Sequence, residues 1–321
     1  MSPVTYRPMR AGEEEEALDL WERCYEVSRR YVSSRYRGEP ARRPEWTLVA
    51  VDDGRIVSTV HRVPRTVRRP SGEAWHIAIV GYVATDPASR RRGHSGALLR
   101  LTAEALEREG CAWAMLFTHI PGHYAPHGWR TLPSRHREGA IAGRAPASAP
   151  WVIDRWLPGS EGWAPLARIY SAYNTRRPLS TVREAAYWSG YAGPQLLERD
   201  GVILVARAGA GAPPAAYARA QYRDGVVAVT ECGALAGSEA ALPALMGAIA
   251  REARARRCRD GRANLPCDGP ADAAVHALLD APRTARRETV MLRAVAPSFD
   301  LSAVEAASAL PGAIFWSADD A

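Results

Sequence analysis

The stretch Arg90–Gly96, with the sequence RRRGHSG, places three arginines, two glycines and a serine within seven residues. It follows a predicted strand and opens a predicted helix, whose first turn offers unpaired N–H groups and a partial positive charge. Glycines let anion oxygens approach the backbone, and the arginine fork fits phosphate oxygens. The stretch matches neither the GxxxxGK[ST] nor the GxGxxG nucleotide-binding pattern. Taken alone, it fits a solvated basic loop and an anion-binding loop equally well.

A second group of polar side chains follows at His119, His123 and His127, each four residues from the last. That spacing could align three zinc ligands on one helix face. However, Pro121, Gly122 and Pro126 interrupt the helix that such a site requires. We therefore expect no metal site. Tyr124 lies in the same segment, and Gly128 and Trp129 follow it, so Tyr124 is either a packed aromatic residue or a positioned phenol.

The chain of 321 residues has a net charge of +7 and contains no lysine, so all 42 basic residues are arginine. This balance favours a polyanionic ligand, either a phosphorylated cofactor or nucleic acid. The five cysteines are scattered without a CxxC pair, which indicates reduced thiols. No apolar run reaches the ~20 residues of a membrane span, and the first residues do not read as a leader. We expect a cytoplasmic protein.

Hydrophobic periodicity predicts a mixed α+β fold. Up to about residue 145 the order is strand, helix, three strands, helix, strand, helix and edge strand, with one continuous helix after the first strand. Asp53 and Gly54 mark a hairpin turn, and the unit from Ile77 to Thr118 predicts a right-handed crossover between parallel strands.

The second half repeats the later part of this order. Three strands over 201–235 precede a helix over 238–257, a short strand over 261–267, a helix over 270–281 and a strand over 288–295. We therefore predict two tandem copies of one α/β/α unit with mixed, partly splayed sheets. The predicted boundaries are 1–147, 148–295 and a tail, 296–321, that packs back on the body.

Two motifs at the expected spacing carry a resemblance to a known family. Arg90–Ser95 matches the pattern [RQ]xxGx[GA] after a strand, with Ser95 where glycine or alanine is usual, and Tyr124 precedes Gly128-Trp129. Both resemble the Gcn5-related N-acetyltransferase (GNAT) family. The segment HIPGHYAPHGW and the second copy resemble the Eis-type (enhanced intracellular survival) tandem acetyltransferases, without their sterol-carrier-like third domain. The corresponding loop of the second copy, CGALAGSEAAL, has no arginine, so that copy is predicted to be degenerate and not to bind CoA.

The resemblance implies that acetyl-CoA lies between two splayed strands. A bulge near Tyr82–Val83 would free main-chain N–H groups, and that of Val83 would stabilise the oxyanion. Tyr124 would protonate the leaving thiolate. Ile79 stands where many members carry a glutamate base, so a tail carboxylate of Asp319, Asp320 or Ala321 is the predicted base. The predicted cofactor-binding residues are Val83, Ala84, Thr85, Arg90, Arg91, Arg92, Gly93, His94, Ser95, Gly96, His119 and Ile120.

The function predicted from this resemblance is an acetyl-CoA-dependent N-acetyltransferase acting on a small-molecule amine, such as an aminoglycoside-like antibiotic, with a role in antibiotic resistance. Two alternatives stay open: transfer of another acyl group or to another acceptor, as in thiol biosynthesis, and a non-catalytic CoA- or nucleic-acid-binding regulatory module. We expect neither a membrane nor a nucleic-acid partner. The sequence leaves the oligomeric state open.

Overall fold

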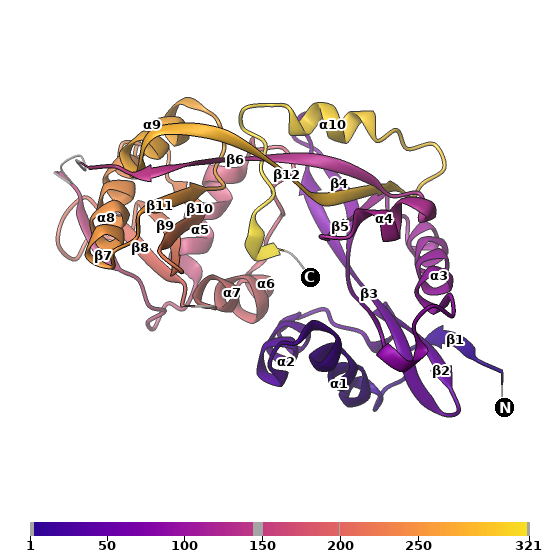
Figure 1. The fold of residues 1–321 in the computed structure, drawn as a ribbon. Helices are drawn as coiled ribbons and strands as arrows, with labels where there is room; N and C mark the ends of the chain where they lie inside the picture. Colours follow the sequence, from indigo (N-terminus) through magenta and orange to yellow (C-terminus); the bar gives the residue numbers. More distant parts are fainter. Residues whose placement is uncertain (1–2, 144–149, 199, 320–321) are drawn as a thin grey trace.

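A computed structural model describes residues 3–143, 150–198 and 200–319. These residues form one mixed α+β body with two lobes joined by a single sheet of 12 strands (Figure 1). The predicted boundary at 147/148 lies outside the described residues. The strand order is β1-β2-β3-β4-β5-β12-β6-β11-β10-β9-β8-β7. The α+β class predicted from the sequence is confirmed.

The first lobe is built from the elements up to β6. Its strands are β1 (Thr5–Pro8), β2 (Thr47–Asp52), β3 (Arg55–Arg68), β4 (Ala74–Thr85), β5 (Trp113–Phe117) and β6 (Arg130–Ile141). Its helices are α1 (Glu14–Tyr25), α2 (Arg29–Gly38), α3 (His94–Arg108) and α4 (Pro121–Tyr124). The single helix predicted after β1 is wrong, because Glu26 adopts a φ of 53° and Ser28 caps a second helix by accepting from the Tyr31 N–H.

The second lobe repeats this plan. Its strands are β7 (Val152–Arg155), β8 (Val202–Arg207), β9 (Ala216–Arg223), β10 (Val226–Ala234), β11 (Asp260–Ala263) and β12 (Leu279–Ala294). Its helices are α5 (Ala164–Asn174), α6 (Ala185–Tyr187), α7 (Gly193–Leu197), α8 (Ala241–Ala255) and α9 (Gly269–Leu278), and α10 (Ser302–Ser308) follows β12. In each lobe the fourth and fifth strands pair in parallel and the other neighbours are antiparallel.

Two long strands, β6 and β12, are shared between the lobes (Figure 1). β12 pairs with β5 on one side and with β6 on the other, while β6 also pairs with β11. The first lobe therefore has the order β1-β2-β3-β4-β5-β12-β6, and the second has β7-β8-β9-β10-β11-β6-β12. The predicted edge strand after Trp129 is wrong, because β6 lies between two strands. The predicted helix end at 281 is also wrong, because β12 begins at Leu279.

A bulge adjusts the pairing of the two shared strands. Pro133 has no N–H to give to the ladder, and the β12 register shifts opposite it, between Arg287 and Val290. Two residues of β12 thus face one residue of β6, which bends the strand at the junction of the lobes.

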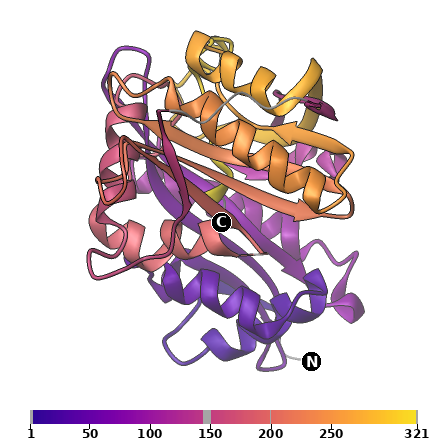
Figure 2. The ribbon, with the colours of Figure 1, turned by 90° about the vertical axis from the view of Figure 1, so that its left-hand side faces the viewer.

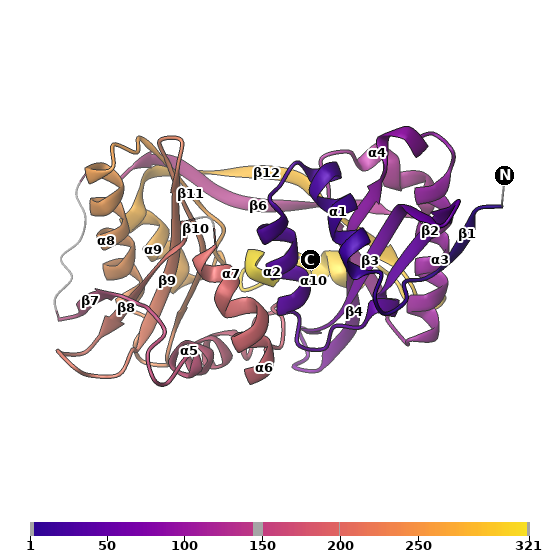
Figure 3. The ribbon, with the colours of Figure 1, turned by 90° about the horizontal axis from the view of Figure 1, so that it is seen from below.

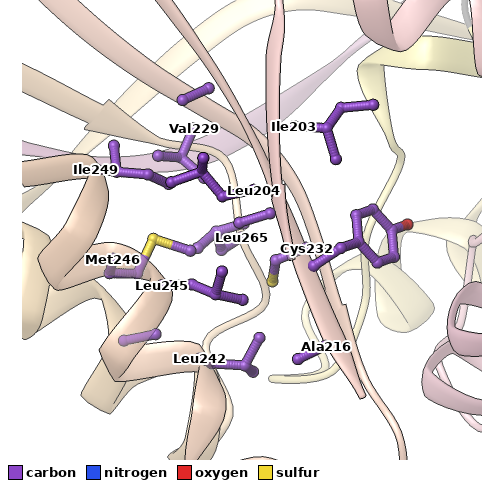
Figure 4. Packing of buried hydrophobic residues seen from close by; sticks show 14 of the residues in the cluster. Ile203, Leu204, Ala216, Val229, Cys232, Leu242, Leu245, Met246, Ile249 and Leu265 are labelled. Atoms are coloured by element: carbon purple, nitrogen blue, oxygen red, sulfur yellow. The ribbon is translucent and has the colours of Figure 1, made fainter. Parts of the chain in front are cut away.

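Each lobe has its own hydrophobic core. In the second lobe, Leu242, Leu245 and Met246 of α8 pack against Leu204 and Val229 of the sheet (Figure 4). Figure 2 views this lobe with α8 in front of the strands. In the first lobe, alternate residues of β4 and β5 face two separate clusters, one against α3 and one against the segment that follows β12.

The C-terminal segment runs back between the lobes (Figures 1 and 3). Phe299 and Phe315 pack edge-on against Trp75 and Trp113 of the first lobe, at centroid distances of 6.0 and 6.2 Å. Trp316 is buried in the core of the second lobe and donates to Asn174 Oδ1 at 2.8 Å. This segment therefore connects the two cores. Among the described residues, no helix is long and apolar enough to cross a membrane.

A buried ion-pair network fixes the end of this segment. Arg183 Nε donates to Asp319 Oδ1 at 2.8 Å, and its Nη2 donates to Glu231 Oε2 at 2.7 Å. Tyr187 donates to Asp319 at 3.1 Å, and Tyr217 donates to Glu231 at 2.6 Å. The guanidinium carbon lies 4.0 Å from the centre of the Tyr170 ring. The carboxylates of Asp319 and Glu231 are thus both neutralised by the buried guanidinium group of Arg183.

Substituting Arg183→Met should therefore lower the free energy of unfolding by about 3–5 kcal/mol, because two carboxylates stay buried without their cation. Urea unfolding measures this loss. The control is Arg100→Met, which breaks an exposed pair with Glu104 and should cost about 0.5 kcal/mol or less. An equal loss in the two variants would contradict the role given to the network.

Candidate active site

The site is centred on a gap between the parallel strands β4 and β5. They pair only from Ile77 to Ile79, opposite Trp113 to Met115. Beyond this point β4 continues to Thr85, but its register with β5 ends. The carboxyl ends of β4 and β5 therefore diverge and leave a gap between them. This is the splayed pair of strands predicted from the sequence.

A β-bulge lies on the β4 side of the gap. The register with β3 passes from Thr59↔Ala84 to His61↔Gly81, so Tyr82 and Val83 together face one residue. The predicted bulge is confirmed. Tyr82 has a φ of 46°, in the left-handed region. Its ring stacks on Trp21 at 4.2 Å, and its carbonyl accepts from the Thr59 hydroxyl at 2.9 Å. These contacts hold an unfavourable backbone conformation that removes two residues from the β3 ladder.

The basic loop follows β4 directly and leads into α3. Arg91 and Gly93 have φ values of 63° and 81°, and α3 begins at His94 without a side-chain cap. The first-turn N–H groups of α3 are therefore left without the usual capping partner. Arg90, Arg91 and Arg92 are exposed around this turn. Arg90 donates from Nε to the Thr85 carbonyl at 3.3 Å, and Arg92 lies 3.5 Å from Asp52. The local geometry suits an anion.

His94 and Gly96 contribute to this loop differently from what the sequence suggests. The His94 side chain is buried, and its Nδ1 shares a hydrogen bond of 2.9 Å with the Tyr6 hydroxyl. Its imidazole therefore faces the protein interior, and only its main chain remains for a ligand. A Cβ on Gly96 would lie 2.8 Å from His127 Cε1. Gly96 thus also allows the segment after α4 to pack against α3.

Tyr124 lies at the end of the short helix α4, beside the gap, and is buried. Trp129 and His123 pack around its ring at centroid distances of 6.4 and 4.9 Å. Burial raises the pKa of the Tyr124 phenol, and a hydrogen bond with the Thr118 hydroxyl partly offsets this. The phenol is therefore protonated at neutral pH and can act as a proton donor.

The remaining predicted residues lie around the same gap. Val83, Ala84 and Thr85 lie on β4 after the bulge begins, and the exposed His119 and Ile120 follow β5 on the other side. The structure thus brings the predicted β4, loop and β5 residues to one end of the sheet. Their roles stay predictions. Across the described residues, no group of three His, Cys, Asp or Glu side chains could hold a metal ion.

A cavity of about 210 Å³ opens at the gap. Its polar side chains are four tyrosines and one arginine, namely Tyr25, Tyr31, Tyr82, Tyr124 and Arg35. Tyr25 donates to the Val83 carbonyl at 3.2 Å. Arg35 reaches the second lobe, donating to Gln195 at 2.6 Å and Tyr191 at 3.1 Å. Sequence reasoning missed Tyr25, Tyr31 and Arg35, because no motif marks α1 or α2 and the Arg35 partners lie about 160 residues away.

Among the described residues that line this cavity, none is a carboxylate or a histidine. Asp319, one of the predicted bases, has its carboxylate bound to Arg183 and Tyr187 and is absent from the lining. That arrangement makes Asp319 an anchor for the C-terminal segment. Asp320 and Ala321 lie outside the described residues, so the prediction for them is untested.

Comparison with known proteins gives a family match for the lobe that carries this site. Residues 5–132 match the family model described as "Acetyltransferase (GNAT) domain". The matched residues lie in the first lobe and end at the start of β6. This match includes the bulge, the basic loop and Tyr124, and members of the GNAT family use acyl-CoA. No curated protein matches the chain.

Solved structures show that the likeness in fold extends over both lobes. A probable N-acyltransferase of Enterococcus faecalis V583 has a TM-score of 0.70 at 16% identity, over 92% of this chain and 73% of that chain. Eis1 of Mycobacterium abscessus has a TM-score of 0.65 at 18% identity, over 94% and 76%. A tandem GNAT protein from the clavulanic acid biosynthesis pathway has a TM-score of 0.53 at 16% identity, over 92% and 100%. At these identities the likeness concerns the fold alone.

The left-handed turn at Gly93 gives a test of the loop geometry. Gly93→Ala should lower the free energy of unfolding by about 1–2 kcal/mol, because its φ of 81° penalises any Cβ although the space around it is open. The matched control is Gly122→Ala, at a glycine that also has open space but no positive φ. Thermal or urea unfolding distinguishes the two. The loop geometry would be contradicted if Gly93→Ala were as stable as the control.

Proposed function

We propose that the protein is an acetyl-CoA-dependent N-acetyltransferase that acts on a primary amine of a small molecule. The observation that carries the proposal is the gap between β4 and β5, with the bulge at Tyr82–Val83 on one side and the uncapped start of α3 behind it. This geometry would supply main-chain donors to a thioester carbonyl and an anion site to a pyrophosphate within one continuous stretch of chain, which supports the proposal.

We propose that different residues around the gap bind different parts of acetyl-CoA. The loop from Arg90 to Gly96 would hold the pyrophosphate through the N–H groups of α3 and the exposed guanidinium groups. Val83 and Thr85 would form main-chain hydrogen bonds with the pantetheine arm and the acetyl carbonyl. His119 and Ile120 would flank the arm from the β5 side. Tyr82 and Val83 are out of register with β3, and the Val83 N–H would stabilise the oxyanion.

The proposed reaction is a direct attack of the amine on the thioester carbonyl. A C–N bond forms, the C–S bond breaks, and the amine proton passes to a base, for which we propose the carboxylate of Asp320 or of Ala321. Tyr124 gives its proton to the departing sulfur. A thiol has a pKa of about 8.5 and a phenol of about 10, so this transfer is modestly uphill and requires the phenol to lie within hydrogen-bond reach of the departing sulfur. The raised pKa of Tyr124 keeps the donor protonated through neutral pH.

Substituting Tyr124→Phe should lower kcat at least ~100-fold, because the leaving thiolate loses its proton donor. Release of free thiol from acetyl-CoA in the presence of amines measures turnover, and calorimetry measures acetyl-CoA binding, which should not change. Tyr222→Phe, on β9 of the second lobe and outside the cavity, is the matched control and should keep full activity.

Three outcomes would decide between the functions considered. Unchanged turnover in Tyr124→Phe would remove the phenol from the mechanism. Binding of acetyl-CoA by the wild-type protein without thiol release for any amine would favour a non-catalytic CoA-binding module. Faster turnover with a longer acyl-CoA would identify another acyl group as the natural donor.

A further inference from the structure

We propose that a second, larger cavity beside the gap is the acceptor site, and that it selects an amine that also carries an anionic group, a carboxylate or a phosphate. This inference rests on the proposed acyl transfer and adds the chemistry of the acceptor. The cavity measures about 590 Å³, within the ~300–1,000 Å³ range of small-molecule sites. Its walls are β6, β12 and the segment after α10.

The position of the cavity follows from the alternation of side chains on β4 and β5. Val80 and Leu116 belong to the cluster that packs against α3. Ile79 and Met115 belong to the cluster on the opposite face, under the C-terminal segment. Phe117 lies two residues beyond Met115, so it points to that same opposite face.

Phe117 connects the two cavities. Its ring is 41% exposed, and it lines both the 210 Å³ cavity at the gap and the 590 Å³ cavity. The anion-binding loop opens α3, which packs on the other face of the sheet. An acceptor in the larger cavity would therefore reach the gap from the face opposite the basic loop.

The charge of the larger cavity is strongly unbalanced. Arg135, Arg286 and Arg287 line it, whereas Glu305 is the single carboxylate among its lining residues. Within residues 3–143, 150–198 and 200–319, no carboxylate forms an ion pair with any of these three arginines. Two of them, Arg135 and Arg286, are direct cross-strand partners. Like charges in such positions destabilise a sheet, and a bound anion would relieve the repulsion.

His136 of β6 also lines this cavity. Its side chain is buried, its Nε2 lies 3.3 Å from Glu138, and its Nδ1 has no partner among the described residues. Burial and the neighbouring Arg287 lower the pKa of His136. A neutral imidazole at this position adds no further charge to the cavity.

The same cavity disfavours a polycationic acceptor. An aminoglycoside would place several ammonium groups near three arginines and one glutamate, and discrimination against a ligand commonly comes from such like-charge contacts. An acceptor with a carboxylate or phosphate would instead form charge-assisted hydrogen bonds with the guanidinium groups. The aminoglycoside-like acceptor expected from the sequence is therefore not the class that this cavity favours.

Matched acceptor pairs test the inference with the full-length protein and acetyl-CoA. The carboxylate arm compares ε-aminocaproate with its primary amide, the phosphate arm compares O-phosphoethanolamine with ethanolamine, and kanamycin serves as the polycation. We expect kcat/KM to be about 10-fold or more higher for the anionic member of at least one pair, the effect of one charge-assisted hydrogen bond. The arm with the larger ratio identifies the anion. Equal rates within both pairs, or a preference for kanamycin, would overturn the inference.

Single substitutions assign the effect to the cavity. Arg286→Gln and Arg287→Gln should each raise KM for the preferred anionic acceptor about 10-fold with a smaller change in kcat, and should leave KM for the neutral analogue unchanged. Arg223→Gln is the matched control, because it removes the same charge from an exposed site on β9. Unchanged KM in both cavity variants would overturn the inference, and unchanged acetyl-CoA affinity shows that each variant is folded.

If the proposed acyl transfer does not occur, a binding measurement still tests the anion site. If no amine causes thiol release, calorimetry with O-phosphoethanolamine and ethanolamine tests the cavity directly. Binding of the phosphate compound that is lost in Arg286→Gln would support the anion site without acyl transfer. No binding of either compound would overturn the site as well.

Discussion

β12 returns from the end of the second lobe and pairs with β5 on one side and β6 on the other. Without β12, the N–H and C=O groups on the edge of β5 that faces away from β4 would have no hydrogen-bond partner inside the first lobe. Unpaired backbone groups are strongly unfavourable when they are buried. The exchange of β6 and β12 therefore makes each lobe's sheet depend on the other lobe. It also fixes Phe117 opposite Val290 and places the arginines of β12 beside the end of the gap.

This shared pair of strands also decides what covers the two faces of the first lobe. α3 covers one face and follows the basic loop, whereas the chain after β12 crosses the other face and ends in the Arg183–Asp319 anchor. In the proposed function, donor and acceptor would bind on opposite faces of the sheet and would meet where β4 and β5 diverge. Both sides are rich in arginine, which suits a polyanionic donor on one face and an anionic acceptor on the other.

The features of the site that depend on neighbouring residues could be predicted from the sequence. The loop after β4, the bulge at Tyr82–Val83 and the turn that carries Tyr124 each depend on residues close together in the chain. The position of β12 could not be predicted, because its pairing depends on strands about 150 residues away and its N-terminal half is rich in polar residues. The sequence predicts β6 as an edge strand for the same reason, because both of its partners are distant in the chain. Arg35 and Phe117 became site residues only through contacts between distant elements.

The central claim is that the first lobe alone binds acyl-CoA, at the bulge and the start of α3. Hydrogen exchange of the backbone amides with and without acetyl-CoA tests this most directly. The account predicts slower exchange at residues 83–85 and 91–97 in the presence of acetyl-CoA, and no change in the corresponding loop of the second lobe, residues 232–242. Protection of the second loop, or equal exchange throughout the first, would contradict it.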